Sequence, residues 1–331
     1  MVYFNFGTMD NYFPQDPNIW SGRRSDRGEY LHEIVRCISL EADGLKLTRE
    51  NQTVFALLGF ACDEGVRRNQ GRPGAAKGPE EIRKALGKMA NHLTPETVLL
   101  DAGNIICENG DMEGAQSGLS TAVGTLLQHK IFPVLLGGGH EIAYGHFKGI
   151  HEYVSRPHPD KVIGIINLDA HFDLRKTEGM GNSGTPFYQI SEALAPEGLH
   201  YLCLGIQKHS NSRSLYETAI ELGVEYIEME DFHLGNIDHV RETIVRFIEK
   251  ADYIYLTIDL DGFSSDMAPG VSAPSPFGFS IAMAREALKT IYVSGKLISV
   301  DIAELNPLYD IDCRTAKLGA GLVLNLMQEL T

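Results

Sequence analysis

A chain of 331 residues, 43% of them hydrophobic and 22% charged, has an ordinary globular composition and ample length for one large core. Its 44 acidic against 29 basic residues give a net charge of −15, which argues against nucleic acid and membranes as partners because such a surface repels phosphate backbones and anionic lipid. The cysteines are scattered and form no C-x-x-C pair, and the sequence shows neither a signal-peptide pattern nor an apolar run of roughly 18 residues. These features predict a cytoplasmic protein.

Taken in chain order, the first fifty residues follow no regular pattern and predict an irregular arm with one helix near Glu29–Leu40. Short apolar runs then predict strands at Val54–Leu58, Val98–Asp101, Phe132–Leu136, Val162–Leu168, Tyr201–Leu204, Val224–Ile227, Tyr253–Ile258 and Leu297–Asp301. Amphipathic stretches predict helices at Pro79–Met89, Met112–Gln128, Ser212–Leu222, Ile237–Glu249, Ile281–Tyr292 and Cys313–Gln328. This alternation is typical of a parallel sheet covered on both faces, and no linker divides it. We therefore expect a single α/β domain over residues 1–331, with residues 1–50 as the arm.

Three predicted strands end in unusual polar residues. The strand Phe132–Leu136 is followed by three glycines and His140, Val162–Leu168 by Asp169-Ala-His171-Phe-Asp173, and Tyr253–Ile258 by Asp259-Leu-Asp261. Residues two apart on an extended chain point to the same side, and sites in such sheets lie beyond the carboxyl ends of the strands. We expect these carboxylates and imidazoles to converge on one spot.

Four carboxylates in one place would repel one another and resist ionisation unless positive charge lies between them. Two divalent cations would supply that charge, and hard oxygen ligands with two imidazoles and no thiolate favour Mn²⁺ over zinc. Two cations about 3.5–4 Å apart can share a water and hold it as hydroxide near neutral pH. The strand ends therefore predict a hydrolytic site.

Each motif alone has a plainer interpretation. The glycines Gly137–Gly139 could form a phosphate-binding turn, although the P-loop lysine and the full dinucleotide spacing are absent. A lone histidine is more often structural, and an isolated Asp-x-Asp is usually a solvated loop. Their joint occurrence at three strand ends favours the metal site. A nucleotide-binding protein and a metal-binding regulatory protein without catalysis remain as alternatives.

From about Leu57 to the C-terminus, the chain resembles the arginase–agmatinase–formimidoylglutamase family. The resemblance lies in the ordered motifs Gly-Gly-Gly-His140, Asp169-Ala-His171-Phe-Asp173, Asp259-Leu-Asp261-Gly and Asp301-Ile-Ala-Glu304-Leu-Asn-Pro307. It implies a three-layer α/β/α sandwich on an eight-stranded, mainly parallel sheet, a homo-oligomer, and two Mn²⁺ ions per subunit. The implied metal ligands are His140, Asp169, His171, Asp173, Asp259 and Asp261.

Within the family, three stretches are most similar to formimidoylglutamases: Asp63–Ala76, Asn182–Phe187 and Ala268–Pro274. Arginases carry a histidine in a Ser-Gly-Asn-x-His stretch, where this chain continues with Thr185 and Pro186. The resemblance implies that a metal-bridging hydroxide cleaves the formimidoyl C–N bond of N-formimidoyl-L-glutamate. The products would be L-glutamate and formamide, as in histidine degradation. Another ureohydrolase, acting on agmatine or a guanidino acid, is the alternative.

Two carboxylates are expected to act in catalysis. Asp173 would accept a hydrogen bond from the attacking hydroxide and pass its proton to the departing nitrogen. Glu304, just beyond the strand Leu297–Asp301, would pair with the amidinium and orient it. Asp301 is expected to support the site rather than bind metal, because six ligands and a bridging hydroxide already serve two ions.

The substrate's two carboxylates need cationic partners, which an acidic protein has to supply locally. Guanidinium groups bind carboxylates bidentately, so arginines near the strand ends are the natural candidates. Neighbouring polar side chains in the loop that follows Gly181 would add further contacts. The predicted substrate-binding residues are Arg68, Arg72, Arg175, Asn182, Ser183 and Thr185.

Overall fold

The computed structural model describes residues 9, 11–25, 27–41, 52–177, 179–195 and 197–331. All eight predicted strands are confirmed, as β3 (Thr53–Ala61), β4 (Thr97–Ile106), β5 (Phe132–Leu136), β6 (Ile163–Leu168), β7 (Tyr201–Ile206), β8 (Glu225–Glu228), β9 (Tyr253–Asp259) and β10 (Leu297–Ala303). They pair in parallel in the order β4-β3-β5-β10-β9-β6-β7-β8. The strands β5, β10, β9 and β6 therefore lie side by side at the centre of the sheet.

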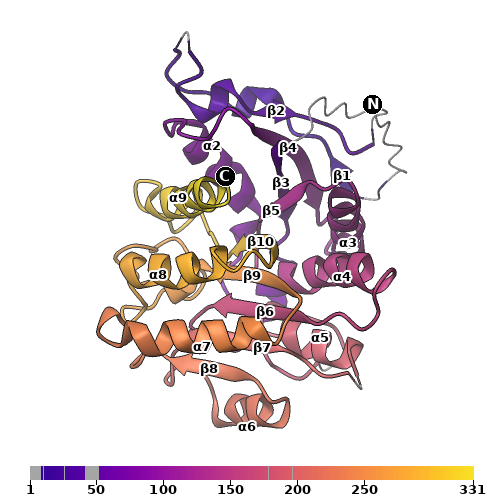
Figure 1. The fold of residues 1–331 in the computed structure, drawn as a ribbon, viewed down its shortest axis with the longest axis vertical. Helices are drawn as coiled ribbons and strands as arrows, with labels where there is room; N and C mark the ends of the chain where they lie inside the picture. Colours follow the sequence, from indigo (N-terminus) through magenta and orange to yellow (C-terminus); the bar gives the residue numbers. More distant parts are fainter. Residues whose placement is uncertain (1–8, 10, 26, 42–51, 178, 196) are drawn as a thin grey trace.

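Helices cover both faces of this sheet (Figure 1). One layer comprises α2 (Gly78–Gly87), α9 (Arg314–Glu329), α8 (Ile281–Tyr292) and α7 (Ile237–Glu249). The other layer comprises α3 (Met112–Gln128), α4 (Ile142–Ser155) and α5 (Pro186–Ala193). The helix α6 (Arg213–Glu221) lies near β8. Alternate strand residues serve two separate cores: Val54 packs on the α3 side and Phe55 on the α2 side. The three-layer α/β/α sandwich is confirmed. In the described part of the chain, no helix combines the length and hydropathy needed to cross a membrane.

The sequence patterns missed α4 and α5. Glycine is a poor helix former, and α4 contains two glycines that interrupt its pattern. In the structure these glycines allow close packing on α3, because a Cβ on Gly145 would lie 2.8 Å from the carbonyl oxygen of Gln116, and one on Gly149 would lie 2.5 Å from that of Ser120. The helix α4 therefore depends on contacts with α3, which lies elsewhere in the sequence, and the residues of α4 alone do not reveal these contacts.

The predicted helix near Glu29–Leu40 is wrong. This segment forms a 3-10 turn at Leu31–Glu33 and then the short strand β2 (Arg36–Cys37), which pairs in parallel with β4. A second short strand, β1 (Tyr12–Phe13), pairs antiparallel with β4. Hydrogen bonds to the edge of β4 replace those that a helix would make within itself. Within the predicted arm, residues 1–8, 10, 26 and 42–50 lie outside the described residues.

Candidate metal centre and active site

The six residues predicted to bind metal lie together at the carboxyl ends of the central strands. They form two groups, and within each group the potential ligand atoms lie within 4.8 Å of one another: His140, Asp169, Asp173 and Asp259 in the first, and Asp169, His171 and Asp261 in the second. Asp169 belongs to both, because its Oδ2 lies 3.2 Å from His140 Nδ1 and its Oδ1 lies 3.5 Å from His171 Nδ1. The arrangement resembles two cation sites that share one carboxylate.

Buried atoms in these groups have no ordinary hydrogen-bond partner. His140 Nδ1 lies 3.0 Å from an oxygen of Asp173 and 3.0 Å from one of Asp259, yet forms no hydrogen bond with any described residue. One oxygen of Asp261 is likewise buried without a partner in the described structure. Buried polar atoms are nearly always paired. The unpartnered atoms and the oxygen-rich donor set both fit divalent cations.

The electrostatics of the cluster also fit cations. Burial, reinforced by repulsion from Asp261 and Asp169, raises the pKa of Asp259 well above its usual value. Burial is also the main cause that raises the pKa of Asp261 to about 6. Burial alone would lower the pKa of His140, but the surrounding carboxylates outweigh it and hold that pKa well above its usual value. Without metal, the cluster therefore retains protons, and cations that bind there must displace them.

The backbone is strained at the two predicted catalytic carboxylates. Asp173 has a φ of +50° and Glu304 a φ of +70°, in the left-handed region that costs a non-glycine residue roughly 1–2 kcal/mol. Tertiary hydrogen bonds hold Glu304 in this conformation: its N–H donates to the Gly138 carbonyl at 2.8 Å, and its Oε1 accepts from the His140 N–H at 2.9 Å. Such strain is typical of functional sites.

The glycine run before His140 has a steric explanation. A Cβ on Gly138 would lie only 1.7 Å from the carbonyl oxygen of Cys62, so that position admits no side chain. The next residue, Gly139, donates its N–H to the same carbonyl at 2.9 Å. The glycines thus allow the loop after β5 to pack on the loop after β3, and a bound phosphate is not needed to account for them.

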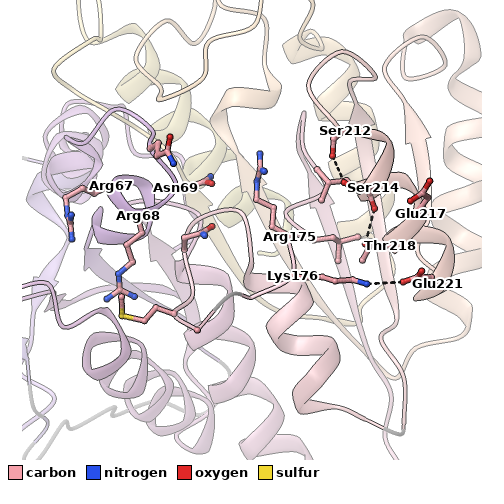
Figure 2. Close-up of a pocket in the computed structure, with 16 residues that line it drawn as sticks. Arg67, Arg68, Asn69, Arg175, Lys176, Ser212, Ser214, Glu217, Thr218 and Glu221 are labelled. Carbon is pink, nitrogen blue, oxygen red and sulfur yellow. Dashed lines mark hydrogen bonds and ion pairs between the residues drawn. The ribbon is translucent and has the colours of Figure 1, made fainter.

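A cavity of about 310 Å³ lies over the cluster. Its lining includes His171, Asp173, Asp259, Asp261, Glu304, Arg72, Arg175 and Ser183. It adjoins an outer pocket of about 1100 Å³, and the two share Asn69, Gln70, Arg175 and Leu215. Figure 2 shows Arg175 in the middle of the outer pocket, between Asn69 on one side and the residues of α6 on the other. Arg175 therefore lies where the outer pocket meets the inner cavity.

The three candidate arginines differ in what they contact. Arg72 donates to the carbonyl oxygens of Ser272, at 2.9 Å, and Val271, and its guanidinium lies 3.9 Å from the ring centre of Tyr309. Arg68 forms ion pairs with Glu64 at 2.9 Å and with Glu113 at 2.6 Å, and it lines only the outer pocket. The guanidinium of Arg175 contacts no hydrogen-bond or ion-pair partner among the described residues. Of the three, Arg175 is the one available to a bound anion.

The predicted polar residues after Gly181 occupy three different places. Ser183 lines the inner cavity and accepts a hydrogen bond from Asn69 at 3.1 Å. Asn182 lines the outer pocket, and its side-chain oxygen accepts from the Gly184 N–H. Thr185 lines neither pocket, because its buried hydroxyl accepts from the Asn182 N–H at 2.8 Å and so stabilises the loop. The cavity is also lined by residues that sequence reasoning did not single out: Asn69, Gln70, Ser210 and Asn211. Asn69 and Gln70 lie within the stretch Asp63–Ala76 that resembles formimidoylglutamases, whereas Ser210 and Asn211 lie in a loop without a recognisable motif.

Comparisons with known proteins agree with this geometry. The model of the arginase family matches residues 53–328. The chain is 42% identical over 327 residues to a formimidoylglutamase of Clostridium tetani, covering 97% of this chain and 96% of the relative. It is 41% identical over 321 residues to a formimidoylglutamase of Chromobacterium violaceum, covering 95% and 99%.

Two solved structures share the fold. The formimidoylglutamase of Bacillus subtilis superposes with a TM-score of 0.77 at 24% identity, covering 93% of this chain and 94% of the other. Trypanosoma cruzi formiminoglutamase with Mn2+2 superposes with a TM-score of 0.73 at 26% identity, covering 86% and 95%. The family match, the identity over nearly the whole length and the shared fold together show that the chain belongs to the arginase family.

Proposed function

We propose that this protein is a formimidoylglutamase that hydrolyses N-formimidoyl-L-glutamate to L-glutamate and formamide. It would act in the cytoplasm, as a step in histidine degradation. The observation that carries the proposal is the pair of ligand groups that share Asp169 beneath a cavity. This cavity is also lined by Arg175, whose guanidinium has no hydrogen-bond or ion-pair partner in the part of the chain that the structure describes. Relatives at 41–42% identity over nearly the full length bear the same name, which supports this substrate over agmatine or arginine.

We infer that two Mn²⁺ ions bind per subunit, one in each ligand group. Asp169 supports this count because its two oxygens face different histidines. The oxygen-rich donor set supports the choice of metal, as does the Mn²⁺ named for the Trypanosoma cruzi relative. When bound, a pair of such ions supplies a water that loses a proton near neutral pH.

The chain's own carboxylates would handle the proton and the substrate. The Asp173 side chain is 14% exposed, whereas those of His140, Asp169 and Asp259 are at most 3% exposed, so it is the member of its group most open to the cavity. From there it can accept a proton from the attacking water and donate it to the glutamate nitrogen as the C–N bond breaks. Water thus supplies the oxygen of formamide, and its proton leaves on glutamate.

Glu304 is suited to orient the amidinium. It lines the cavity, and its Oε2 is buried without a hydrogen-bond partner among the described residues. An amidinium N–H aimed at this oxygen would satisfy it and hold the reacting carbon in place. Burial, with repulsion from Asp259 and Glu141, raises the pKa of Glu304 well above its usual value, and a substrate cation would favour its ionised form.

Arg175 is our candidate for binding a substrate carboxylate. Its position between the inner cavity and the outer pocket would place that carboxylate away from the cluster, while the amidinium lies near Glu304. Arg72 would contribute positive charge from a fixed position, since backbone carbonyls and Tyr309 already hold it.

A substrate panel tests the function directly. The Mn²⁺-loaded protein is incubated with formimidoylglutamate, agmatine and arginine, and formamide and urea are measured. We expect formamide from the first substrate; urea from either of the others, without formamide, would assign a different ureohydrolase activity. The variant Asp173→Asn should fold, by circular dichroism, but lose about 10²–10⁴-fold in kcat. Asp160→Asn, an exposed residue outside both pockets, is the matched control. A fully active Asp173→Asn variant would refute the proposed proton transfer.

A further inference from the structure

A row of buried polar residues crosses the central strands one step behind the metal cluster. Asn167 and Thr257 each precede a proposed ligand by two residues, so they point to the same face of the sheet as that ligand. In the sheet register Asn167 pairs with Thr257, and Thr257 pairs with Asp301. All three are 0% exposed. Burying polar groups in apolar strands is costly unless hydrogen bonds compensate, so their partners indicate what they do.

The hydrogen bonds of Thr257 fix their own direction. Its hydroxyl donates to Asp301 Oδ1 at 2.6 Å, and a hydroxyl has only one hydrogen to donate. The ring atom His140 Nε2 lies 3.0 Å from the same hydroxyl oxygen. Thr257 can therefore only accept there, and Nε2 has to carry the hydrogen. In a neutral ring this leaves the lone pair on Nδ1, the atom that faces the carboxylates of the cluster.

Asp301 is itself held from several sides. Its Oδ2 accepts hydrogen bonds from the hydroxyl of Tyr255 and from His146 Nδ1, the latter at 2.6 Å. The other ring nitrogen of His146 lies 2.6 Å from the hydroxyl of Ser299, which donates to the carbonyl of Pro133 at 3.0 Å. The chain of contacts thus ends on β5, the strand that leads to His140. Asp301 is fixed as an acceptor, and this keeps Thr257 in its orientation.

We propose that Thr257 and Asp301 are positioning residues, which act through His140 to hold its Nδ1 lone pair toward the metal ion of the first ligand group. The proposal rests on the metal centre proposed above. The His140 ring also packs against Phe187 in a T-shaped pair, with ring centres 5.4 Å apart. Packing thus limits the tilt of the ring, while the hydrogen bond selects its tautomer. Partners of this kind typically change metal affinity about 10–100-fold when removed.

Asn167 shows the same pattern on the neighbouring strand. Its side-chain nitrogen donates to Asp169 Oδ2 at 2.9 Å, the oxygen that belongs to the first ligand group. Two ligands of that group, His140 and Asp169, are thus held by the polar row. No hydrogen bond or ion pair joins the row's Asn167, Thr257 and Asp301 to His171 or Asp261. Loss of Thr257 should therefore affect one ion more than the other.

The test is Mn²⁺ binding by equilibrium dialysis, without substrate. Thr257→Val keeps the shape of the side chain but cannot accept a hydrogen bond from His140. We expect the Mn²⁺ dissociation constant of one site to rise about 10–100-fold and that of the other site to stay near its wild-type value. Thr257→Ser retains the hydroxyl and should restore binding. Thr243→Val is the matched control, since Thr243 is also buried and its hydroxyl has no partner among the described residues.

The outcomes separate the two proposals. Wild-type affinity for both ions in Thr257→Val would overturn the positioning role, and so would equal weakening of both ions, because that would indicate a general structural effect. If Thr257→Val does not fold, Asp301→Asn decides in the same assay, with the same selective loss expected and unchanged affinity against it. A wild-type protein that binds no Mn²⁺ would instead refute the metal centre itself.

Discussion

Glu141 allows a prediction about pH and stability, because it is a buried acid with little to stabilise its charge. It directly follows His140, is 0% exposed, and accepts a hydrogen bond from the Gly65 N–H at 2.9 Å. Its Oε2 has no hydrogen-bond partner within the described residues. Burial raises the pKa of Glu141 from the ordinary 4.5 to about 7. The folded protein therefore binds this proton more tightly than the unfolded chain does.

The sign of the effect follows from linkage. Well below pH 4.5, Glu141 is protonated in both the folded and the unfolded state, so its ionisation does not affect the free energy of unfolding. As pH rises from 4.5 through about 7, the unfolded chain ionises first, so the folded state loses stability. Above pH 7 the full penalty applies, and a pKa difference of this size corresponds to roughly 3 kcal/mol. Glu141 thus destabilises the metal-free protein at neutral pH.

The substitution Glu141→Gln removes the ionisation but keeps an oxygen to accept from the Gly65 N–H. We expect it to raise the free energy of unfolding more at pH 8 than at pH 5, by roughly 2–3 kcal/mol. Urea unfolding of the metal-free protein in chelator measures this difference. Glu152→Gln, at an exposed position of the same helix α4, is the matched control. If the stability of Glu141→Gln and of the wild type changed in parallel with pH, the reasoning would be refuted.

Two further substitutions test arginines in different roles. Arg175→Gln should raise the KM for formimidoylglutamate about 10–100-fold, as loss of a charge-assisted hydrogen bond implies. Arg156→Gln, at an exposed position that lines neither the inner cavity nor the outer pocket, should leave KM unchanged. Equal KM values for both variants in steady-state assays would exclude Arg175 as the carboxylate partner. Arg83→Met would leave Asp101 buried without its ion pair of 2.8 Å and should lower the free energy of unfolding by about 3–5 kcal/mol. The control Arg241→Met removes an exposed ion pair and should cost only about 0–1 kcal/mol. Comparable losses for the two variants in urea unfolding would contradict this expectation.

The candidate metal cluster could be predicted from the sequence because its geometry is local to each strand end. The alternation of side chains along an extended chain places Asp169, His171 and Asp173 on one side, and the ends of parallel strands share one edge of the sheet. The order of the strands is not local. The contact between His140 and Glu304 spans 164 residues, and only the placement of β10 beside β5 explains it.

The candidate substrate-binding residues could not be ranked from the sequence, because the availability of each side chain depends on partners far away along the chain. Arg72 and Arg175 both lie in loops near the carboxyl ends of strands: Arg72 follows the short helix Glu64–Arg68 after β3, and Arg175 follows β6. Yet the guanidinium of Arg72 is engaged by carbonyls about 200 residues away along the chain, at Val271 and Ser272, and that of Arg175 has no such partner among the described residues. A sequence shows that a guanidinium is present, whereas only the fold shows whether it is free to bind a ligand.

The polar row behind the cluster lies between these two cases. Asn167, Thr257 and Asp301 are visible in the sequence as polar residues within otherwise apolar strands, and Asp301 was expected to support the site. Their joint role follows only from the register, which aligns all three across β6, β9 and β10. A polar residue two positions before a predicted ligand, on a buried strand, is therefore a usable signal for a residue that orients that ligand.

The same features that suit the site to cations make it unfavourable without them. Asp259, Asp261 and Glu304 all have pKa values raised chiefly by burial, and Glu304 also has a left-handed backbone. By the sign argument given for Glu141, each raised carboxyl pKa makes the metal-free fold less stable as pH rises toward neutrality. Cations that bind the folded state replace the retained protons and reverse this loss. Added Mn²⁺ should therefore stabilise the protein more at pH 8 than at pH 5, which couples its stability to the ions that its proposed chemistry needs.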